Sequence, residues 1–246
     1  VVTSQDGFGD GGRSELLGAY GIRLNVARVA TKRGESAALA KSIGFPVAMK
    51  LRSPQVVHKS DIGGVRLNVR SEAAAAQVFD ELQAVLKKAM PGAVFEGVSV
   101  ERMLSGGVET IIGMTRDPAF GPIVLFGLGG VAVELLRDVQ VRLAPLTDTD
   151  AEEMIRKIRG YPLLDGFRGA PKANEASLLD LLHRVSLLAS DHAELLELDL
   201  NPVLALPGDS PSIALDARVR LGAPAARGSS EGKAAAATAG ASVPTR

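Results

Sequence analysis

The chain has 246 residues, of which 46% are apolar, enough to bury a core in one large domain or two small ones. Basic and acidic residues balance at 28 each and aromatic residues make up only 4%, which argues against a nucleic-acid binder that relies on charge or base stacking. No apolar run reaches the roughly 18 residues of a membrane-spanning helix, and the absence of cysteine excludes disulfides and fits a reducing compartment, so we expect a cytoplasmic protein.

The two ends of the chain differ in composition from the middle. Residues 1–12 are polar and rich in glycine, and residues 222–246 are dominated by alanine, glycine and serine. Segments of this kind bury too little apolar surface to offset the entropy cost of ordering. We therefore expect a flexible N-terminal segment and a disordered C-terminal tail on either side of an ordered region.

Within the ordered region, helices and strands alternate. In chain order, the hydrophobic periodicity predicts a helix at 14–20, a strand at 26–29, a helix at 35–43, strands at 47–51 and 65–69, a helix at 71–90, strands at 94–103, 109–115 and 123–126, helices at 149–159 and 175–190, and strands at 196–204 and 213–219. Neighbouring strands that are joined like hairpins favour antiparallel sheets. We therefore expect an α+β fold rather than a doubly wound parallel sheet.

Two local patterns add detail to these elements. The strand at 65–69 alternates between apolar and polar residues, which predicts that Val65, Leu67 and Val69 face the core. The helix at 149–159 begins at Thr149 and has Glu152 three residues later, which is the spacing of a capping box.

The last two strands place oxygen-bearing side chains on one face. In LELDLNPVLA the leucines alternate with acidic residues and Asn201, and in the following strand Asp216 shares a face with Ala214. Antiparallel pairing can bring Asp216 beside Asn201 and Asp199, where the carboxylates repel one another unless a cation lies among them. Such oxygen ligands suit Mg²⁺ that shares the phosphate oxygens of a nucleotide. An ordinary hairpin with a solvated acidic face explains the same alternation equally well.

Three glycines, Gly127, Gly129 and Gly130, come at the end of another apolar strand. A glycine-rich turn can expose several backbone N–H groups to an anion. The spacing fits neither the dinucleotide-binding fingerprint nor the Walker A pattern. A strand that ends in a tight turn is therefore the stronger interpretation of this segment.

A lysine and a histidine follow one another closely in a single strand and loop. Lys50 lies inside an apolar strand, and His58 lies in the next loop, which ends in two glycines. A strand lysine that faces a cleft can bind phosphate, and a neutral imidazole can act as a nucleophile toward phosphorus. Taken singly, each residue has an ordinary explanation as a surface side chain. The other histidines, His183 and His192, lie in or after a leucine-rich helix and are interpreted as structural or solvent-exposed.

Four separate blocks of sequence carry a family resemblance. They are GFPVAMKLRSPQVVHKSDIGGVRLNV, GVSVERMLSGGVETIIGMTRDPAFGPIVLFGLGG, RLAPL, and the pair ELDLNPVLA and ALDARV. In this order they resemble the ATP-grasp subunit of the ADP-forming acyl-CoA synthetases, which are relatives of the succinyl-CoA synthetase β subunit. The resemblance covers about residues 14–221. It implies an ATP-grasp fold of two α+β subdomains, which we place at 13–97 and 98–221.

The resemblance also implies roles for individual residues. These roles are contact with the nucleotide phosphates for Lys50, recognition of adenine for Glu101, Arg102 and Met103, and binding of Mg²⁺ for Asn201, Asp216 and Asp199. His58 matches the histidine that carries a phosphoryl group on a mobile loop between ADP or ATP and a distant acyl site. Lys59 can stabilise the transferred charge.

The implied activity is that of an acid–thiol ligase, which forms acyl-CoA while ATP is converted to ADP. The CoA-binding part belongs to an α-type subunit or domain, so we expect a hetero-oligomer or a fused enzyme. A catalytically silent nucleotide-binding module, a scaffolding subunit and a domain of a fused protein acyltransferase stay open as alternatives. The sequence determines neither the acyl group nor the choice between ATP and GTP.

Overall fold

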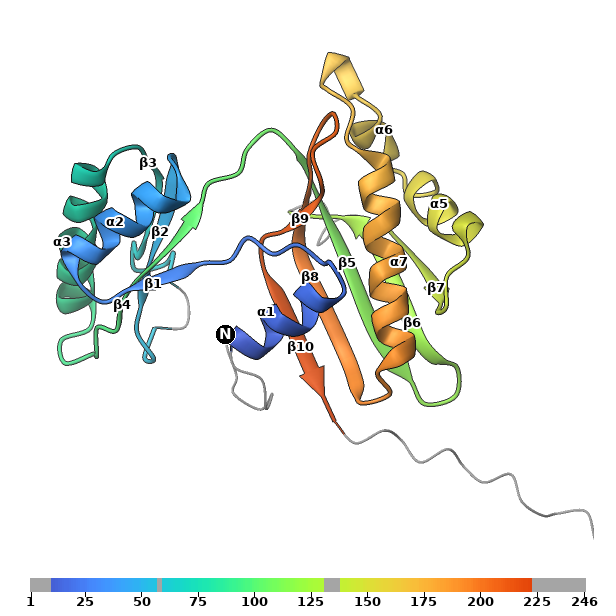
Figure 1. Cartoon of the computed structure of the whole chain (residues 1–246), viewed down its shortest axis with the longest axis horizontal. Helices are drawn as coiled ribbons and strands as arrows, with labels where there is room; N and C mark the ends of the chain where they lie inside the picture. The colour runs from blue at the N-terminus through green and yellow to red at the C-terminus, as the bar shows by residue number, and fades with distance from the viewer. Residues whose placement is uncertain (1–9, 57–58, 131–137, 223–246) are drawn as a thin grey trace, which may run out of the picture.

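The computed structural model describes residues 10–56, 59–130 and 138–222, and its ribbon forms two lobes that each contain one β-sheet (Figure 1). Every strand pair within the two sheets of these residues is antiparallel, which confirms the predicted α+β class. The segments expected to be flexible lie outside the described residues, apart from 10–12 and residue 222. None of the helices in the described ranges is both long and apolar enough to cross a membrane.

The small lobe is a four-stranded sheet with two helices on one face. In spatial order its strands are β1 (Arg28–Ala30), β4 (Gly97–Arg102), β2 (Val47–Arg52) and β3 (Val65–Val69), and its helices are α2 (Arg33–Ile43) and α3 (Glu72–Ala89). The helix α3 is capped by Ser71, whose side chain accepts a hydrogen bond from the N–H of Ala74. Phe79 and Leu82 of α3 are buried in one apolar cluster with Met49 of β2. In Figure 1 the helix-covered face of this sheet is turned away from the large lobe.

The large lobe contains the second sheet and the remaining helices. In spatial order its strands are β10 (Ala217–Leu221), β8 (Leu195–Ala205), β5 (Val108–Asp117), β6 (Gly121–Leu128) and β7 (Val139–Leu143), with β9 (Ile213–Ala214) paired to β8. The helices are α1 (Asp10–Ala19), α5 (Asp148–Arg156), α6 (Tyr161–Leu164), a 3₁₀ turn (Phe167–Gly169) and α7 (Glu175–Asp191). The core joins α7 to the sheet, for example through Leu182 and Phe126, which are both fully buried.

The lobes are not consecutive stretches of the chain. Leu17 of α1 is fully buried in the core of the large lobe, so the described part of the chain starts in that lobe, builds the small lobe and then returns. This differs from the expected division into 13–97 and 98–221 in two places, because α1 packs in the large lobe and β4 belongs to the small sheet. The sequence shows where strands occur but not which sheet a strand joins.

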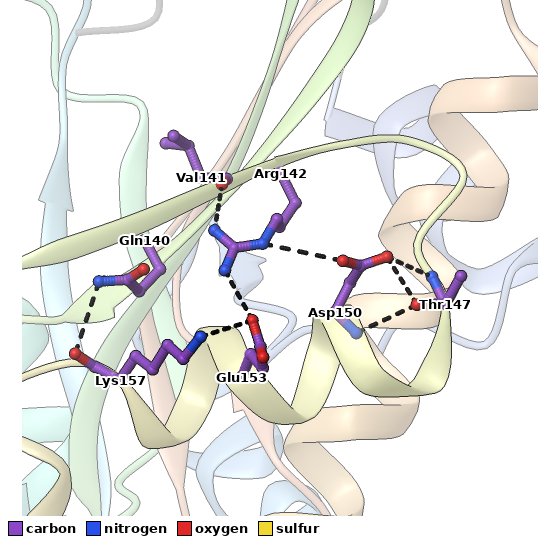
Figure 2. Close-up of polar contacts among 7 residues, drawn as sticks. All are labelled: Gln140, Val141, Arg142, Thr147, Asp150, Glu153 and Lys157. Carbon is purple, nitrogen blue, oxygen red and sulfur yellow. Dashed lines mark hydrogen bonds and ion pairs between the residues drawn. The ribbon is translucent and has the colours of Figure 1, made fainter.

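The predicted capping box is wrong by two residues. The helix α5 begins at Asp148, and the box consists of Thr147 and Asp150 rather than Thr149 and Glu152, as Figure 2 shows for the first pair. In both pairs the second residue follows the first by three positions, as a capping box requires. Leu146, which precedes the cap, and Ala151, the fourth helical residue, are buried in the same apolar cluster, which is the placement expected at a helix that starts at Asp148.

The predicted alternation of β3 is also wrong, because the side chain of Leu67 is 62% exposed. The pairing of β2 with β3 shifts by one residue between Val47–Val69 and Met49–Arg66. Such a bulge changes which residues of the strand face the core. Arg66 consequently faces α3, where it forms an ion pair with Glu81.

Candidate functional site

Lys50 and Glu101 form an ion pair on the helix-free face of the small sheet. They lie on the neighbouring strands β2 and β4, where Ala48 is opposite Glu101 and Ser99 is opposite Lys50. The Nζ of Lys50 contacts the Oε1 of Glu101. The lysine side chain is 39% exposed, whereas that of the glutamate is only 11% exposed. The pair therefore presents a cation to solvent above a largely buried counter-charge, and a phosphate can reach that cation.

The segment that follows β4 is held at the place where the two lobes connect. The N–H of Met103 donates to the carbonyl oxygen of Pro46 at 3.0 Å. The side-chain amide of Asn25 donates to the carbonyl oxygen of Arg102 at 2.9 Å. Asn25 lies on the connection from α1 to β1, and Met103 lies on the connection from β4 to β5, so the two crossings between the lobes are tied together here (Figure 1).

The predicted phosphoryl carrier His58 lies outside the described residues, but both ends of its loop are described. Val56 is buried in a small apolar cluster with Leu51. On the returning side, the N–H of Gly64 donates to the carbonyl oxygen of Lys59 at 2.7 Å, and the Gly64 carbonyl accepts from the N–H of Leu51 at 2.8 Å. The loop therefore starts and ends at the strand that carries the candidate phosphate ligand.

Asn201 and Asp216, which the sequence predicts to be neighbours, lie side by side on the large sheet. The N–H of Asn201 donates to the carbonyl oxygen of Asp216 at 3.2 Å, and both residues are exposed. One carboxylate oxygen of Asp216 accepts a hydrogen bond from the N–H of Ala217 at 2.9 Å. The second oxygen and the Asn201 amide are available as hard ligands for a cation.

Asp199 lies on β8 opposite Arg218 of β10. Burial raises the pKa of its carboxyl group, an effect that Arg218 opposes and that Asp216 and Glu197 reinforce. Glu197 itself forms an ion pair with Arg220 at 2.9 Å, which leaves the carboxylates of Asp199 and Asp216 on this face for a cation. In the described ranges no three His, Asp or Glu side chains lie close enough to hold a metal ion by themselves. The residues fit Mg²⁺ when water and phosphate oxygens supply the other ligands.

The predicted strand at 213–219 is interrupted. It consists of β9 and β10, with a bend at Leu215 and Asp216 between them. Ala214 is fully buried in the core of the large lobe, so the prediction that it shares a face with Asp216 was wrong. The N–H of Leu215 donates to the carbonyl oxygen of Pro202 at 2.8 Å, which fixes the bend beside Asn201.

The glycines after the apolar strand serve close packing. Gly127 lies within β6, and a Cβ at this position would come within 2.8 Å of the Asp138 carbonyl oxygen. The N–H of Gly129 donates to the carbonyl oxygen of Glu109 at 2.7 Å, so it is not free for an anion. Residues 131–137 lie outside the described ranges. For Gly127 and Gly129, strand packing is the interpretation that the contacts support.

The two described histidines, one within α7 and one directly after it, pair with carboxylates of the large lobe. The Nε2 of His183 lies 3.2 Å from Asp148, and the Nδ1 of His192 lies 2.8 Å from Glu194. Both side chains are about one third exposed, which confirms their interpretation as structural or solvent-exposed residues.

Comparison with known proteins gives a consistent result over nearly all of the described chain. A family model described as an ATP-grasp domain matches residues 9–221. The chain is 44% identical over 207 residues to the acetate–CoA ligase [ADP-forming] I subunit beta of Pyrococcus furiosus, which covers 84% of this chain and 88% of that protein. It is 47% identical over 207 residues to the acetate–CoA ligase [ADP-forming] I of Archaeoglobus fulgidus, but it spans only 30% of that longer protein.

Solved structures agree with these matches. The dinucleotide-forming acetyl-coenzyme A synthetase 1 of Ca. Korarchaeum cryptofilum, in complex with coenzyme A and Ca-AMPCP, matches with a TM-score of 0.75 and 44% identity, over 85% of this chain and 90% of that chain. The same enzyme in complex with coenzyme A and Mg-AMPPCP matches with a TM-score of 0.73 and 41% identity, over 86% of this chain and 91% of that chain. In the latter complex a phosphohistidine segment points towards the nucleotide-binding site.

Proposed function

Because the chain belongs to the ATP-grasp family, together with the β subunits of the ADP-forming acetate–CoA ligases, we propose that it is the nucleotide-binding component of such a ligase. The observation that carries this proposal is the ion pair of Lys50 with Glu101. It places an accessible cation on the strand from which the loop of His58 departs, on a sheet face that no helix covers. Strand β2 therefore supplies the proposed phosphate ligand, Lys50, and the loop that follows it contains the proposed phosphoryl carrier, His58.

The proposed reaction moves a phosphoryl group between His58 and the nucleotide. In the direction of ATP formation, an oxygen of the ADP β-phosphate forms a bond to phosphorus while the phosphorus–nitrogen bond to the imidazole breaks, and the imidazole takes up one proton. Lys50 holds the phosphates in position, which lowers the entropy cost of aligning the reacting groups. A covalent carrier is useful here because it divides a transfer between distant sites into two direct ones.

Asn201, Asp216 and Asp199 are the residues that would hold Mg²⁺ beside the phosphates. Bound there, the ion would neutralise phosphate charge during transfer. A relative solved with Mg-AMPPCP supports the use of Mg²⁺ together with the nucleotide. The carboxylate of Glu101 forms an ion pair with Lys50. We therefore propose that Glu101 holds the lysine in position, in addition to its expected contact with adenine.

The acyl group and CoA are assigned to an α-type partner subunit or domain. The curated relatives include an acetate–CoA ligase, a 4-hydroxybutyrate–CoA ligase and a trans-feruloyl-CoA synthase, which match 82–84% of this chain at 34–47% identity. These relatives differ in their acyl group although each has a region similar to this chain. This supports the proposal that residues outside this chain select the acyl group. In the Archaeoglobus relative the matched part is 30% of the protein, which leaves room for the other domains.

Calorimetric titration of the chain with Mg-ADP tests the proposal. Lys50→Met keeps the aliphatic stem and removes the charge, and we expect it to weaken binding about tenfold or more, because a hydrogen bond to a charged group contributes about 1.5–3 kcal/mol. Lys88→Met on the exposed side of α3 is the matched control and should bind as the unchanged chain does. Failure of the unchanged chain to bind Mg-ADP, or full affinity in Lys50→Met, contradicts the proposal.

A further inference from the structure

Asn68 has a backbone conformation that is unusual for its position. It lies in the edge strand β3 with φ 60°, in the left-handed region that non-glycine residues seldom occupy. The pairing of β2 with β3 goes from Val47–Val69 to Met49–Arg66, so Ala48 faces two residues of β3 where one is expected. Asn68 is one of those two, which makes it part of a β-bulge.

The bulge directs the backbone N–H of Asn68 to an unusual acceptor. It donates to the thioether sulfur of Met103 at 3.1 Å. The side chain of Asn68 has a separate partner, because its Oδ1 accepts a hydrogen bond from the Nε of Arg70 at 2.9 Å. Asn68 therefore contacts Met103 through its main chain, and asparagine is among the few residues that adopt this backbone conformation at low cost.

Met103 is consequently fixed at both ends. Its N–H is bonded to Pro46, and its sulfur is bonded to Asn68. Methionine side chains are normally among the most adaptable in proteins, so a methionine held in this way has a defined shape. The bulge thus converts a flexible side chain beside the connection between the lobes into a rigid one.

The residue that precedes Asn68 in β3 is apolar and exposed. Leu67 is 62% exposed and lies two residues from Val65, which is opposite Lys50. Leu67 and Val65 therefore share the sheet face that carries Lys50. Pro46, the partner of the Met103 N–H, directly precedes β2 and is four residues from Lys50, a separation of about 13 Å at the rise of an extended strand. A nucleoside diphosphate with its phosphates at Lys50 can reach this apolar edge with its base.

We propose that Asn68 is a positioning residue, which fixes Met103 through the N–H···S hydrogen bond so that Met103 and Leu67 form an apolar wall for the base of the nucleotide. This inference rests on the proposed function, because it places the phosphates at Lys50. It adds a residue that acts on the base only through Met103, and it gives a role to Leu67, which is 62% exposed although Val69 of the same strand is buried.

The test compares two probes by calorimetry, Mg-ADP and Mg-pyrophosphate, since only the first has a base. Met103→Leu keeps the side-chain volume and removes the sulfur acceptor. Asn68→Val disfavours the left-handed conformation, whereas Asn68→Gly retains both the conformation and the N–H. Leu67→Ser removes the exposed apolar wall, and Leu187→Ser, at a residue that is 54% exposed on α7, is its matched control.

We expect Met103→Leu and Asn68→Val each to weaken Mg-ADP binding about two- to fivefold, the effect of one weak hydrogen bond, and to leave Mg-pyrophosphate binding unchanged. The double variant should lose no more than either single one, because both remove the same contact. Leu67→Ser should weaken only Mg-ADP, whereas Asn68→Gly and Leu187→Ser should match the unchanged chain.

Different results overturn different claims. Equal Mg-ADP affinity in Met103→Leu and the unchanged chain overturns the positioning role, and so does an equal loss for both probes, which indicates a general structural effect. If Asn68→Val does not fold, Met103→Leu and Leu67→Ser decide the question alone. Absence of Mg-ADP binding by the unchanged chain overturns both the proposed function and this inference. If only Lys50→Met weakens Mg-ADP binding, the proposed function is retained and the role of Asn68 is rejected.

Discussion

At the scale of single residues, the arrangement of Lys50 is the informative feature. Its partner Glu101 is only 11% exposed, so the carboxylate has little access to water and depends on the lysine for compensation of its charge. An arriving phosphate does not need to displace the glutamate, because the ammonium group has three donors and is partly exposed. The pair therefore holds the lysine in place before a nucleotide binds, which reduces the entropy lost on binding.

The candidate metal ligands lead to a prediction at the same scale. Asp216→Ala should weaken Mg²⁺-dependent ADP binding about tenfold or more while leaving the fold intact, because it removes a charged ligand from an exposed bend. Titration of ADP with and without Mg²⁺ checks this. Asp209→Ala, at an exposed turn residue near the same hairpin, is the control and should bind normally. The assignment fails if Asp216→Ala retains the full magnesium dependence of the unchanged chain.

At the scale of secondary-structure elements, Arg116 of β5 closes the end of α7. Its Nε donates to the carbonyl oxygen of Leu195 at 3.1 Å, and its Nη2 donates to those of Ala189 and His192 at 2.6 and 2.8 Å. Helices leave their last carbonyl groups without partners, and a guanidinium group at that end also compensates the helix dipole. This residue therefore joins the long helix of the large lobe to its sheet.

Replacement of Arg116 should consequently destabilise the protein. Arg116→Met retains most of the aliphatic stem but leaves the carbonyl groups without a charged donor, so we expect the free energy of unfolding to fall by about 1.5–3 kcal/mol. Arg220→Met removes an arginine from an exposed ion pair with Glu197 and should cost at most about 1 kcal/mol. Urea denaturation of both variants measures the difference. Equal small losses would show that Arg116 is not a cap.

The helix α5 is attached to the edge strand β7 by a network of charges, shown in Figure 2. Arg142 of β7 lies 3.8 Å from Asp150 and 3.0 Å from Glu153, and Lys157 lies 2.8 Å from Glu153. The hydroxyl of Thr147 and its N–H, assisted by Arg142, lower the pKa of Asp150 below its usual value of 3.8. Hydrogen bonds from Lys157 and Arg142 lower the pKa of Glu153 below 4.5.

This network predicts a pH dependence of stability. A carboxyl group whose pKa is lower in the folded state stabilises the fold above its usual pKa, and the contribution disappears as the pH falls through the folded value. The unchanged chain should therefore melt at a higher temperature than Asp150→Asn at pH 7, and the gap should narrow as the pH falls from 4 towards 2. Thermal melts over this pH range provide the measurement. A gap that stays constant with pH would exclude Asp150 as the origin.

The elements also show how far sequence reasoning extends. Long, strongly periodic segments such as α3 and α7 were predicted nearly to the residue, because a buried stripe and a cap are both encoded locally. The edge strand β7 was missed although Val139, Val141 and Leu143 alternate with two polar residues, which is the pattern of a strand. The exposure of Leu67 depends on a register shift against β2, and the pairing of Lys50 with Glu101 depends on the contact of two strands that are distant in sequence. Neither feature is present in any short window of the chain.

At the scale of the whole molecule, the candidate residues divide between two lobes. Lys50, Glu101 and the ends of the His58 loop belong to the small sheet, whereas Asn201 and Asp216 belong to the large one. A nucleotide that is bound by both groups must lie between the lobes, beside the two connections that are tied together through Asn25. Under the proposed function the acyl chemistry takes place in a further part of the enzyme, so we expect the chain alone to bind Mg-ADP and to form no acyl-CoA.

The central claim is that His58 carries the phosphoryl group, and one labelling experiment tests it most directly. The chain is incubated with γ-labelled ATP, Mg²⁺ and an α-type partner, and label that is stable to base and labile to acid, as expected of phosphohistidine, is measured on the chain. We predict such label on the unchanged chain and none on His58→Ala, which should still bind Mg-ADP nearly normally because the residue does not hold the nucleotide. Equal labelling of the two, or full acyl-CoA synthesis by His58→Ala, would contradict the account.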